Sequence, residues 1–156
     1  MIYTYTQQER GISFEEDSHA NKVLRTVCRE VEVEDISLVR LISETLRKEL
    51  YGTSTGIAIA ANQCGFDLRV ILMNTGRFKD TIMINPQIVK ARGDQKFEEG
   101  CLSFPGLKIK KVRPAILNIR FKNESLCYET HKINGLEAVC FSHELDHLNG
   151  KLLIDN

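Results

Sequence analysis

The chain has 156 residues, five cysteines and a formal net charge of zero, because 21 Lys and Arg balance 21 Asp and Glu. This length predicts one domain over residues 1–156 that is large enough to hold a core and a cleft. The balanced charge gives no reason to expect direct nucleic-acid binding. No basic segment leads into a long apolar run, which argues against a signal peptide and against a membrane span.

The N-terminal third is predicted to hold one long helix. Residues 1–20 are polar and irregular, and they form at most one short strand. From Asp35 to Tyr51, apolar side chains recur at helical spacing, which predicts an amphipathic helix that packs on a sheet. Asp35 can cap the start of this helix, and Gly52 is a natural stop.

Strands dominate the middle of the chain. Apolar, β-branched or alternating runs joined by short polar turns predict antiparallel hairpins. These strands are expected over 69–74, 81–85, 115–121 and 126–133. Asn134 and Gly135 close this region before a final helix over 136–149, which stops at Gly150. The order helix, strands, helix predicts an α+β fold without alternating βαβ units.

The final helix contains "HELDH", residues 143–147, which has the HExxH pattern of metal-binding helices. His143 and His147 lie about 6 Å apart along the axis on one face, so both imidazoles can converge on one ion. Glu144 is turned by about 100° and can reach a water on that ion. The same face carries Leu136, Val139 and Cys140. The alternative is a helix whose two histidines bond to backbone groups or acids.

A third ligand must come from another part of the chain, because a catalytic metal site keeps three protein ligands and one open position. Only nine residues follow His147, and Asp155 is their only ionisable oxygen side chain. The third ligand is therefore expected upstream. Asp146 points away from the shared face, so we expect it to be a cap, a surface residue or a support for a ligand.

The upstream candidate is Cys101, in the stretch "EEGCLSFPG" at 98–106, whose glycines let backbone approach an ion or a substrate closely. The cysteines are odd in number and widely spaced, which favours a reducing compartment over a disulfide framework. One of them can then be a thiolate ligand. Cys28 and Cys127 are interpreted as small buried hydrophobes, and Cys140 as part of a cavity wall.

Three stretches together resemble the peptide deformylase family. The family motifs GxGxAAxQ, EGCLS and HExxH read here as "GIAIAANQ" (56–63), "EGCLS" (99–103) and "HELDH" (143–147), in the family's order. The resemblance runs from about Asn21, at "NKVLRTVCREVE", to about Asp155. It implies one catalytic domain in which antiparallel strands wrap around a central C-terminal helix, with an N-terminal helix and a poorly defined segment 1–20.

The resemblance also implies a metal-dependent hydrolase that removes the formyl group from N-formylmethionyl peptides of newly made proteins and releases formate. Cys101, His143 and His147 would bind one divalent ion, with a water or hydroxide in the fourth position. Glu144 would take the water's proton and pass it to the leaving amine. Family precedent favours Fe²⁺ in cells, with Ni²⁺, Co²⁺ or slower Zn²⁺ forms, and a ferrous thiolate site is oxygen-sensitive.

Further roles follow from the same resemblance. Gln63 and the backbone N–H of Leu102 would form the oxyanion hole, where each donor typically contributes about 10²–10³ in rate. The substrate backbone would contact Gly56, Ile57 and Gly100. An apolar pocket for the methionine side chain would be lined by Ile57, Phe97, Leu136, Val139 and Cys140.

The chain departs from the family pattern at two places. The second motif glycine is Ala58, whose methyl group narrows the substrate groove or shifts a backbone angle that glycine permits, whereas Asn62 occupies a variable position. The chain ends soon after "GKLLID", without the C-terminal helix thought to dock bacterial members near the ribosomal exit, so ribosome docking is not carried over. Such short forms fit a virus-encoded or minimal member that acts in the cytoplasm of a bacterial host.

Two other functions stay open at this stage. An HExxH endopeptidase would need a downstream ligand and a longer open cleft, and neither is visible in the sequence. An inactive module that binds metal or formyl peptides would result if Ala58 has abolished catalysis.

Overall fold

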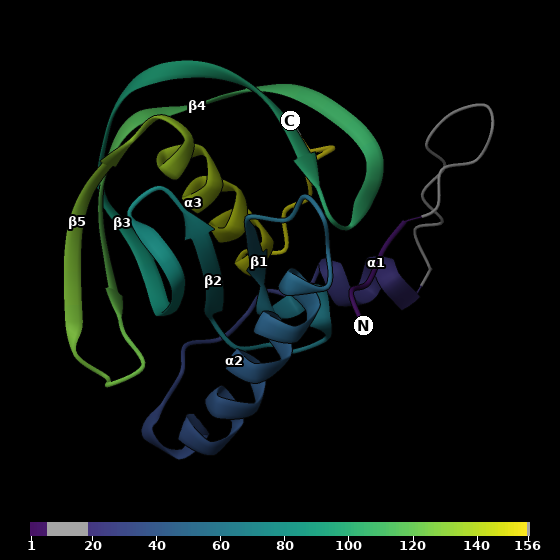
Figure 1. Cartoon of the computed structure of the whole chain (residues 1–156), viewed down its shortest axis with the longest axis vertical. Coiled ribbons are helices and arrows are strands. Elements are labelled where there is room, and N and C mark those ends of the chain that lie inside the picture. Colours follow the sequence, from purple (N-terminus) through teal and green to yellow (C-terminus); the bar gives the residue numbers. More distant parts are fainter. Residues whose placement is uncertain (6–18, 156) are drawn as a thin grey trace.

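The computed structural model describes residues 1–5 and 19–155, which form an α+β fold with an antiparallel sheet (Figure 1). The strands follow the order β1-β2-β3-β4-β5 across the sheet. They span Ala58–Ala60 (β1), Val70–Thr75 (β2), Phe78–Cys101 (β3), Phe104–Lys122 (β4) and Tyr128–Asn134 (β5). The α-helices span His19–Leu24 (α1), Ile36–Tyr51 (α2) and Gly135–Leu148 (α3). Short 3₁₀ turns occupy Val33–Asp35 (η1) and Ala61–Cys64 (η2).

Helix α3 lies in the hollow of the curved sheet and contacts all five strands (Figure 1). Buried side chains of α3, among them Ala138, Phe141 and Leu148, share one core cluster with Phe121 and Ile133 from β4 and β5. The expected α+β fold with antiparallel strands is therefore confirmed. The helix is held by packing along its length, so the "HELDH" turn has a fixed position relative to the strands.

Helix α2 covers the opposite face of the sheet. In β2, Val70 and Leu72 join the cluster beneath α2, whereas Ile71 and Met73 join the cluster beneath α3. Because both faces are covered, the strand reads as a continuous apolar run and lacks the alternation of a half-exposed strand.

The predicted helix over 35–51 is confirmed as α2, and Gly52 is its C-cap residue. Asp35 occupies the N-cap position, but its side chain makes no capping bond to α2. Its carboxylate instead accepts hydrogen bonds from Arg29 and from the backbone N–H of Glu32. The prediction that Asp35 caps the helix is therefore wrong, because nearby donors compete for the same carboxylate.

Strands β3 and β4 are much longer than the predicted segments 81–85 and 115–121. Their outer parts form two long arms that arch over α3 (Figure 1). Most side chains from Gln87 to Glu98 are exposed, so hydrogen bonds to β4 hold this arm with little burial. Sequence patterning misses such arms because it detects a strand by its buried face.

The cysteines and the N-terminal segment agree only in part with the sequence-based predictions. All five cysteines are free, and Cys28 is buried as interpreted, whereas Cys127 is exposed beyond the end of β4, so its interpretation as buried is wrong. Residues 1–5 form no strand, although the backbone N–H of Tyr3 donates to Gln63. Residues 6–18 of the predicted irregular segment lie outside the described residues, and its last two residues, His19 and Ala20, begin α1.

Candidate functional site

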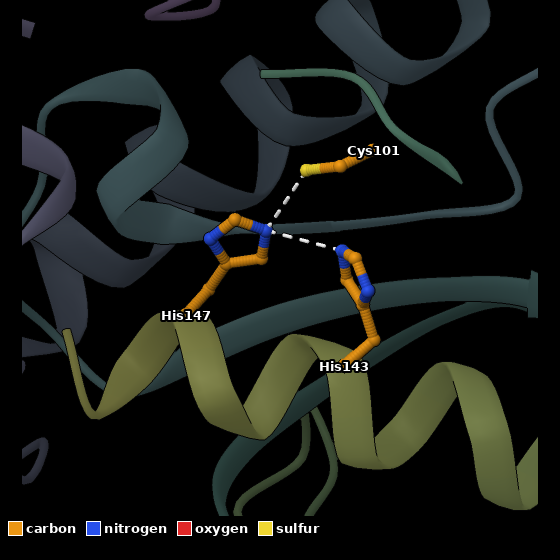
Figure 2. Close-up of side chains that lie close together, drawn as sticks. All are labelled: Cys101, His143 and His147. Carbon is orange, nitrogen blue, oxygen red and sulfur yellow. Dashed lines mark hydrogen bonds between the residues drawn. The ribbon is translucent and has the colours of Figure 1, made fainter. Parts of the chain in front are cut away.

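The side chains of Cys101, His143 and His147 point toward one another (Figure 2). Cys101 is the last residue of β3, and the two histidines occupy successive turns of α3. The Nε2 atom of His147 lies 3.2 Å from the Cys101 sulfur and 3.2 Å from the Nε2 atom of His143. The three donor atoms lie within 4.8 Å of one another. The downstream Asp155, which the sequence did not favour as a ligand, pairs with Arg25.

A chain of charged groups orients His143. Its Nδ1 lies 2.9 Å from Glu99 Oε1, and Arg113 donates two hydrogen bonds to the same carboxylate, at 2.8 and 2.9 Å. Arg113 also donates to Asp146 at 2.6 Å, so Asp146 is linked to His143 through Arg113 and Glu99. When Nδ1 carries the proton and donates to Glu99, the Nε2 lone pair points at the other two donors.

His147 is held differently. It is 1% exposed, and its Nδ1 has no hydrogen-bond partner among the described residues. Its backbone carbonyl accepts a hydrogen bond from the side chain of Asn62, which also donates to Leu24 and Thr26. The variable motif position at Asn62 thus carries a buried side chain that ties η2 to the end of α3.

The donor set fits a divalent cation. Two ring nitrogens bonded to one ion at 2.0–2.1 Å in tetrahedral geometry lie roughly 3.3 Å apart, close to the observed separation. Burial lowers the pKa of His143, but the neighbouring Cys101 and Glu99 outweigh it and raise it to about 10. Burial lowers the pKa of His147 well below its usual value and keeps the ring neutral. The three donor atoms therefore favour a positive charge at the point where they converge, and a divalent ion can occupy that point.

Glu144 lies beside the donors and lines the adjoining cavity. It is 4% exposed, and its Oε2 atom has no hydrogen-bond partner among the described residues. Burial raises the pKa of Glu144 to about 7, although the neighbouring charge of His143 acts in the opposite direction. A carboxyl group with such a pKa can both accept and return a proton near neutral pH.

Gln63 faces the same space from η2. Its Oε1 accepts a hydrogen bond from the backbone N–H of Ala60, which fixes the amide orientation. Its Nε2 then donates to the hydroxyl of Ser103 at 3.0 Å and lies 3.8 Å from the Cys101 sulfur. Leu102 lies in the tight turn between β3 and β4 and lines the cavity with Gln63.

A cavity of about 550 Å³ opens above these groups. All seven predicted substrate-contacting residues line it, namely Gly56, Ile57, Phe97, Gly100, Leu136, Val139 and Cys140. Val139 and Cys140 are buried, whereas Ile57, Phe97 and Leu136 are 38–42% exposed, so apolar side chains surround an open mouth. Burial raises the pKa of the Cys140 thiol to about 12, which suits a wall residue and disfavours a thiolate ligand.

Ala58, which replaces the second glycine of the family motif, lies in a strand beside the cavity. Ala58 pairs with Met73 as a regular strand residue, and it is not among the non-glycine residues with positive φ. Ala58 lines the cavity and is 8% exposed. Ala58 thus has a backbone conformation that any residue can adopt, and the narrower groove stays a prediction.

Sequence reasoning did not assign roles to Glu99, Arg113, Ser103 and Asn62. Glu99 and Ser103 belong to the "EGCLS" stretch, so the motif was a usable signal for them. Arg113 carries no local signal, because its partners lie 14 and 33 residues away in the chain.

Comparisons with known proteins agree with this arrangement. The sequence profile of the family described as "Polypeptide deformylase" matches residues 17–156. Peptide deformylase 2 of Clostridium acetobutylicum is 39% identical over 147 residues, which cover 94% of this chain and 93% of that protein. A probable peptide deformylase from Synechococcus phage S-SSM7 has a TM-score of 0.81 at 29% identity, over 99% of this chain and 97% of the other. A peptide deformylase from Synechococcus elongatus, solved with actinonin, has the same TM-score and identity, over 99% of this chain and 76% of the other.

Fold and site define a metal-dependent hydrolase of the α+β class with a cysteine and two histidines as candidate donors. The chain belongs to the polypeptide deformylase family. It is therefore a peptide deformylase that depends on a metal ion, and the endopeptidase alternative is not favoured. None of the helices in the described part of the chain has the length and hydropathy that crossing a bilayer requires.

Proposed function

We propose that the cavity is the active site, in which Cys101, His143 and His147 hold one divalent ion and Glu144 moves the protons. The convergence of the three donor atoms within 4.8 Å, at the edge of a cavity with an unpartnered carboxylate oxygen, carries this proposal. An ion held there supplies an acidified water and a Lewis acid for the formyl oxygen.

Glu144 accepts the proton of the attacking water as that water adds to the formyl carbon. The C–N bond of the formamide then breaks, and Glu144 returns the proton to the leaving nitrogen. The products are formate and a free amino terminus. The raised pKa of Glu144 supports this double role, because a carboxyl group whose pKa is about 7 accepts and releases a proton with similar ease at neutral pH.

Gln63 and the backbone N–H of Leu102 stabilise the negative charge that develops on the formyl oxygen. The bond from Ala60 to Gln63 supports this role, because it aims the amide donor before the substrate arrives. The substrate backbone lies between Gly56 and Ile57 on one side and Gly100 on the other. β1, which follows Ile57, is an edge strand, so an extended peptide can add to its free edge.

The formylmethionine side chain occupies the apolar part of the cavity, lined by Ile57, Phe97, Leu136, Val139 and Cys140. The substrates are N-formylmethionyl peptides of new chains, processed in the cytoplasm by residues 1–156 acting as one catalytic domain. Fe²⁺ is the ion proposed in cells on family precedent, and a thiolate beside two imidazoles also accepts Zn²⁺, Ni²⁺ or Co²⁺.

The function is tested by formate release from formyl-Met-Ala-Ser with anaerobically prepared protein. We expect release by the native chain and a loss of about 10²–10⁴-fold in a Glu144→Ala variant that still holds its metal. Casein cleavage without formate release would instead indicate an endopeptidase. Tight metal binding with neither activity would indicate an inactive binding module, and Ala58→Gly would then be the variant to restore release.

The donor set is tested by metal content after purification without oxygen. Cys101→Ser should lose most of its metal, whereas Cys127→Ser, a matched change at an exposed thiol, should keep it. Equal loss in both variants would contradict the donor assignment. Elemental analysis of the same native sample identifies the ion.

A further inference from the structure

The mouth of the cavity carries one lysine, Lys108, that the proposed reaction does not use. Lys108 is exposed, lines the cavity, and makes no ion pair with any residue in the described ranges. Two other carboxylates line the same cavity. Glu99 forms an ion pair with Arg113, and Glu144 is buried. Glu98 is the other exposed charge at the mouth.

An irregularity in the sheet brings Lys108 to this position. Cys101 pairs with Phe104 and Glu99 pairs with Ile109, so residues 105–108 of β4 lie opposite Gly100 alone. Extra residues on one strand bend it and re-aim its side chains. Gly106, in the middle of this bulge, has a φ of 80°, which glycine adopts readily. All four bulge residues line the cavity.

The ammonium group of Lys108 lies against the backbone of Gly100. A Cβ atom added to Gly100 would lie 2.7 Å from Nζ and 3.3 Å from Cε of Lys108. The missing side chain at Gly100 therefore provides the space in which the cation rests. Gly100 is also the residue proposed to contact the substrate backbone, so the cation sits beside the proposed path of the peptide.

The exposed acid at the mouth, Glu98, has a different lysine as its cross-strand neighbour. Glu98 lies directly opposite Lys110 in the antiparallel register, so its carboxylate has a cation as its cross-strand neighbour. Lys108 faces a glycine and has no such neighbour. Within the described residues, Lys108 is therefore a cation without an ion-pair partner at the mouth, although the chain as a whole has no net charge.

We propose that Lys108 is a specificity-determining residue that favours formyl peptides with a carboxylate one or two residues after the formylmethionine. This inference rests on the proposed function, which places the formyl group near Cys101 and the peptide along Gly100. An extended peptide advances about 3.3 Å per residue, so its next residues reach the Lys108 ammonium. A solvent-exposed ion pair is weak, and we expect a preference of about two- to fivefold.

The test compares kcat/KM for matched peptides with the full-length, metal-loaded enzyme. Formyl-Met-Glu-Ser is compared with formyl-Met-Gln-Ser, and formyl-Met-Ala-Glu with formyl-Met-Ala-Gln. The native chain should favour Glu over Gln by about two- to fivefold at one of the two positions, and the ratio should fall in high salt. Using a ratio within each enzyme removes any general loss of activity.

Lys108→Gln should bring the Glu to Gln ratio to about one, and Lys108→Glu should invert it, because the mouth then repels carboxylates. Lys96→Gln removes an exposed lysine of β3 that does not line the cavity, and it should keep the native ratio. A native ratio of one at both positions, or a native ratio retained in Lys108→Gln, would overturn the inference. A preference for Lys over Gln peptides would assign control of the mouth to Glu98.

Failure of the proposed function can be told apart from failure of this inference. If no peptide yields formate, the proposed function fails, and binding of the same peptides by fluorescence anisotropy decides the role of Lys108. Tighter binding of the Glu peptide, lost in Lys108→Gln, supports the inference. Equal binding of both peptides overturns it.

Discussion

His143 and His147 occupy successive turns of one helix, yet the protein holds them by different means. The Nδ1 atom of His143 contacts Glu99. Arg113 donates hydrogen bonds to both Glu99 and Asp146. The Nδ1 atom of His147 has no hydrogen-bond partner among the described residues, and the packing around the buried ring holds it in place. One histidine is therefore oriented by charge and the other by packing. This difference predicts that mutations behind the two rings will fail in different ways.

The largest expected effect comes from breaking the charged chain at its centre. Arg113→Met removes the guanidinium that donates two hydrogen bonds to the buried Glu99 carboxylate, which should lower the free energy of unfolding by about 3–5 kcal/mol. Urea unfolding measures the loss. Arg47→Met is the matched control, because Arg47 also pairs with two carboxylates but at the surface, and it should cost at most about 1 kcal/mol. Similar costs for both variants would remove the distinction between buried and exposed networks.

The next effect concerns the metal rather than the fold. Glu99→Gln keeps the size of the side chain but removes the charge that holds the Nδ1 proton of His143. Metal affinity should fall about 10–100-fold, measured by competition with a chelator. In the double variant Glu99→Gln/Arg113→Met, stability should recover relative to Arg113→Met alone, whereas the affinity should stay low. Unchanged affinity in Glu99→Gln would mean that His143 needs no charged partner.

A smaller effect is expected behind His147. Asn62→Ala removes the buried donor to the His147 carbonyl, and we expect a loss of about 1–2 kcal/mol in the free energy of unfolding. Metal affinity should change less than in Glu99→Gln, since no hydrogen bond to the His147 ring is lost. Thermal unfolding and chelator competition on the same sample give both values. A larger loss of affinity than in Glu99→Gln would reverse the comparison.

The smallest effect is expected at the outer end of the charged chain. Asp146 is partly exposed, with 28% of its side chain accessible, so its bond to Arg113 is screened by water. Asp146→Asn keeps a hydrogen-bond acceptor, and it should change the free energy of unfolding by about 0–1 kcal/mol. Urea unfolding checks this value beside Arg113→Met. A cost near that of Arg113→Met would show that Asp146 is an essential part of the network.

The candidate site illustrates how far local patterns reach. The spacing of His143 and His147 follows from helical geometry alone, and α3 has the predicted bounds to within one residue at each end. The choice of Cys101 over four other cysteines came from its glycine-flanked motif, and Cys101 is the cysteine that lies beside the histidines. Cys127 was misread because its exposure depends on a turn beyond β4, which a single apolar residue does not reveal.

The sequence alone determined α2, the α+β class and the HExxH face of α3. Each depends on periodicity or on a short motif, and neighbours in the chain create both. Only the tertiary structure decided that Glu99 meets Arg113, that Asn62 holds the end of α3, and that four residues of β4 lie opposite Gly100. These contacts join distant segments through burial and strand register, and no local repeat records either of them.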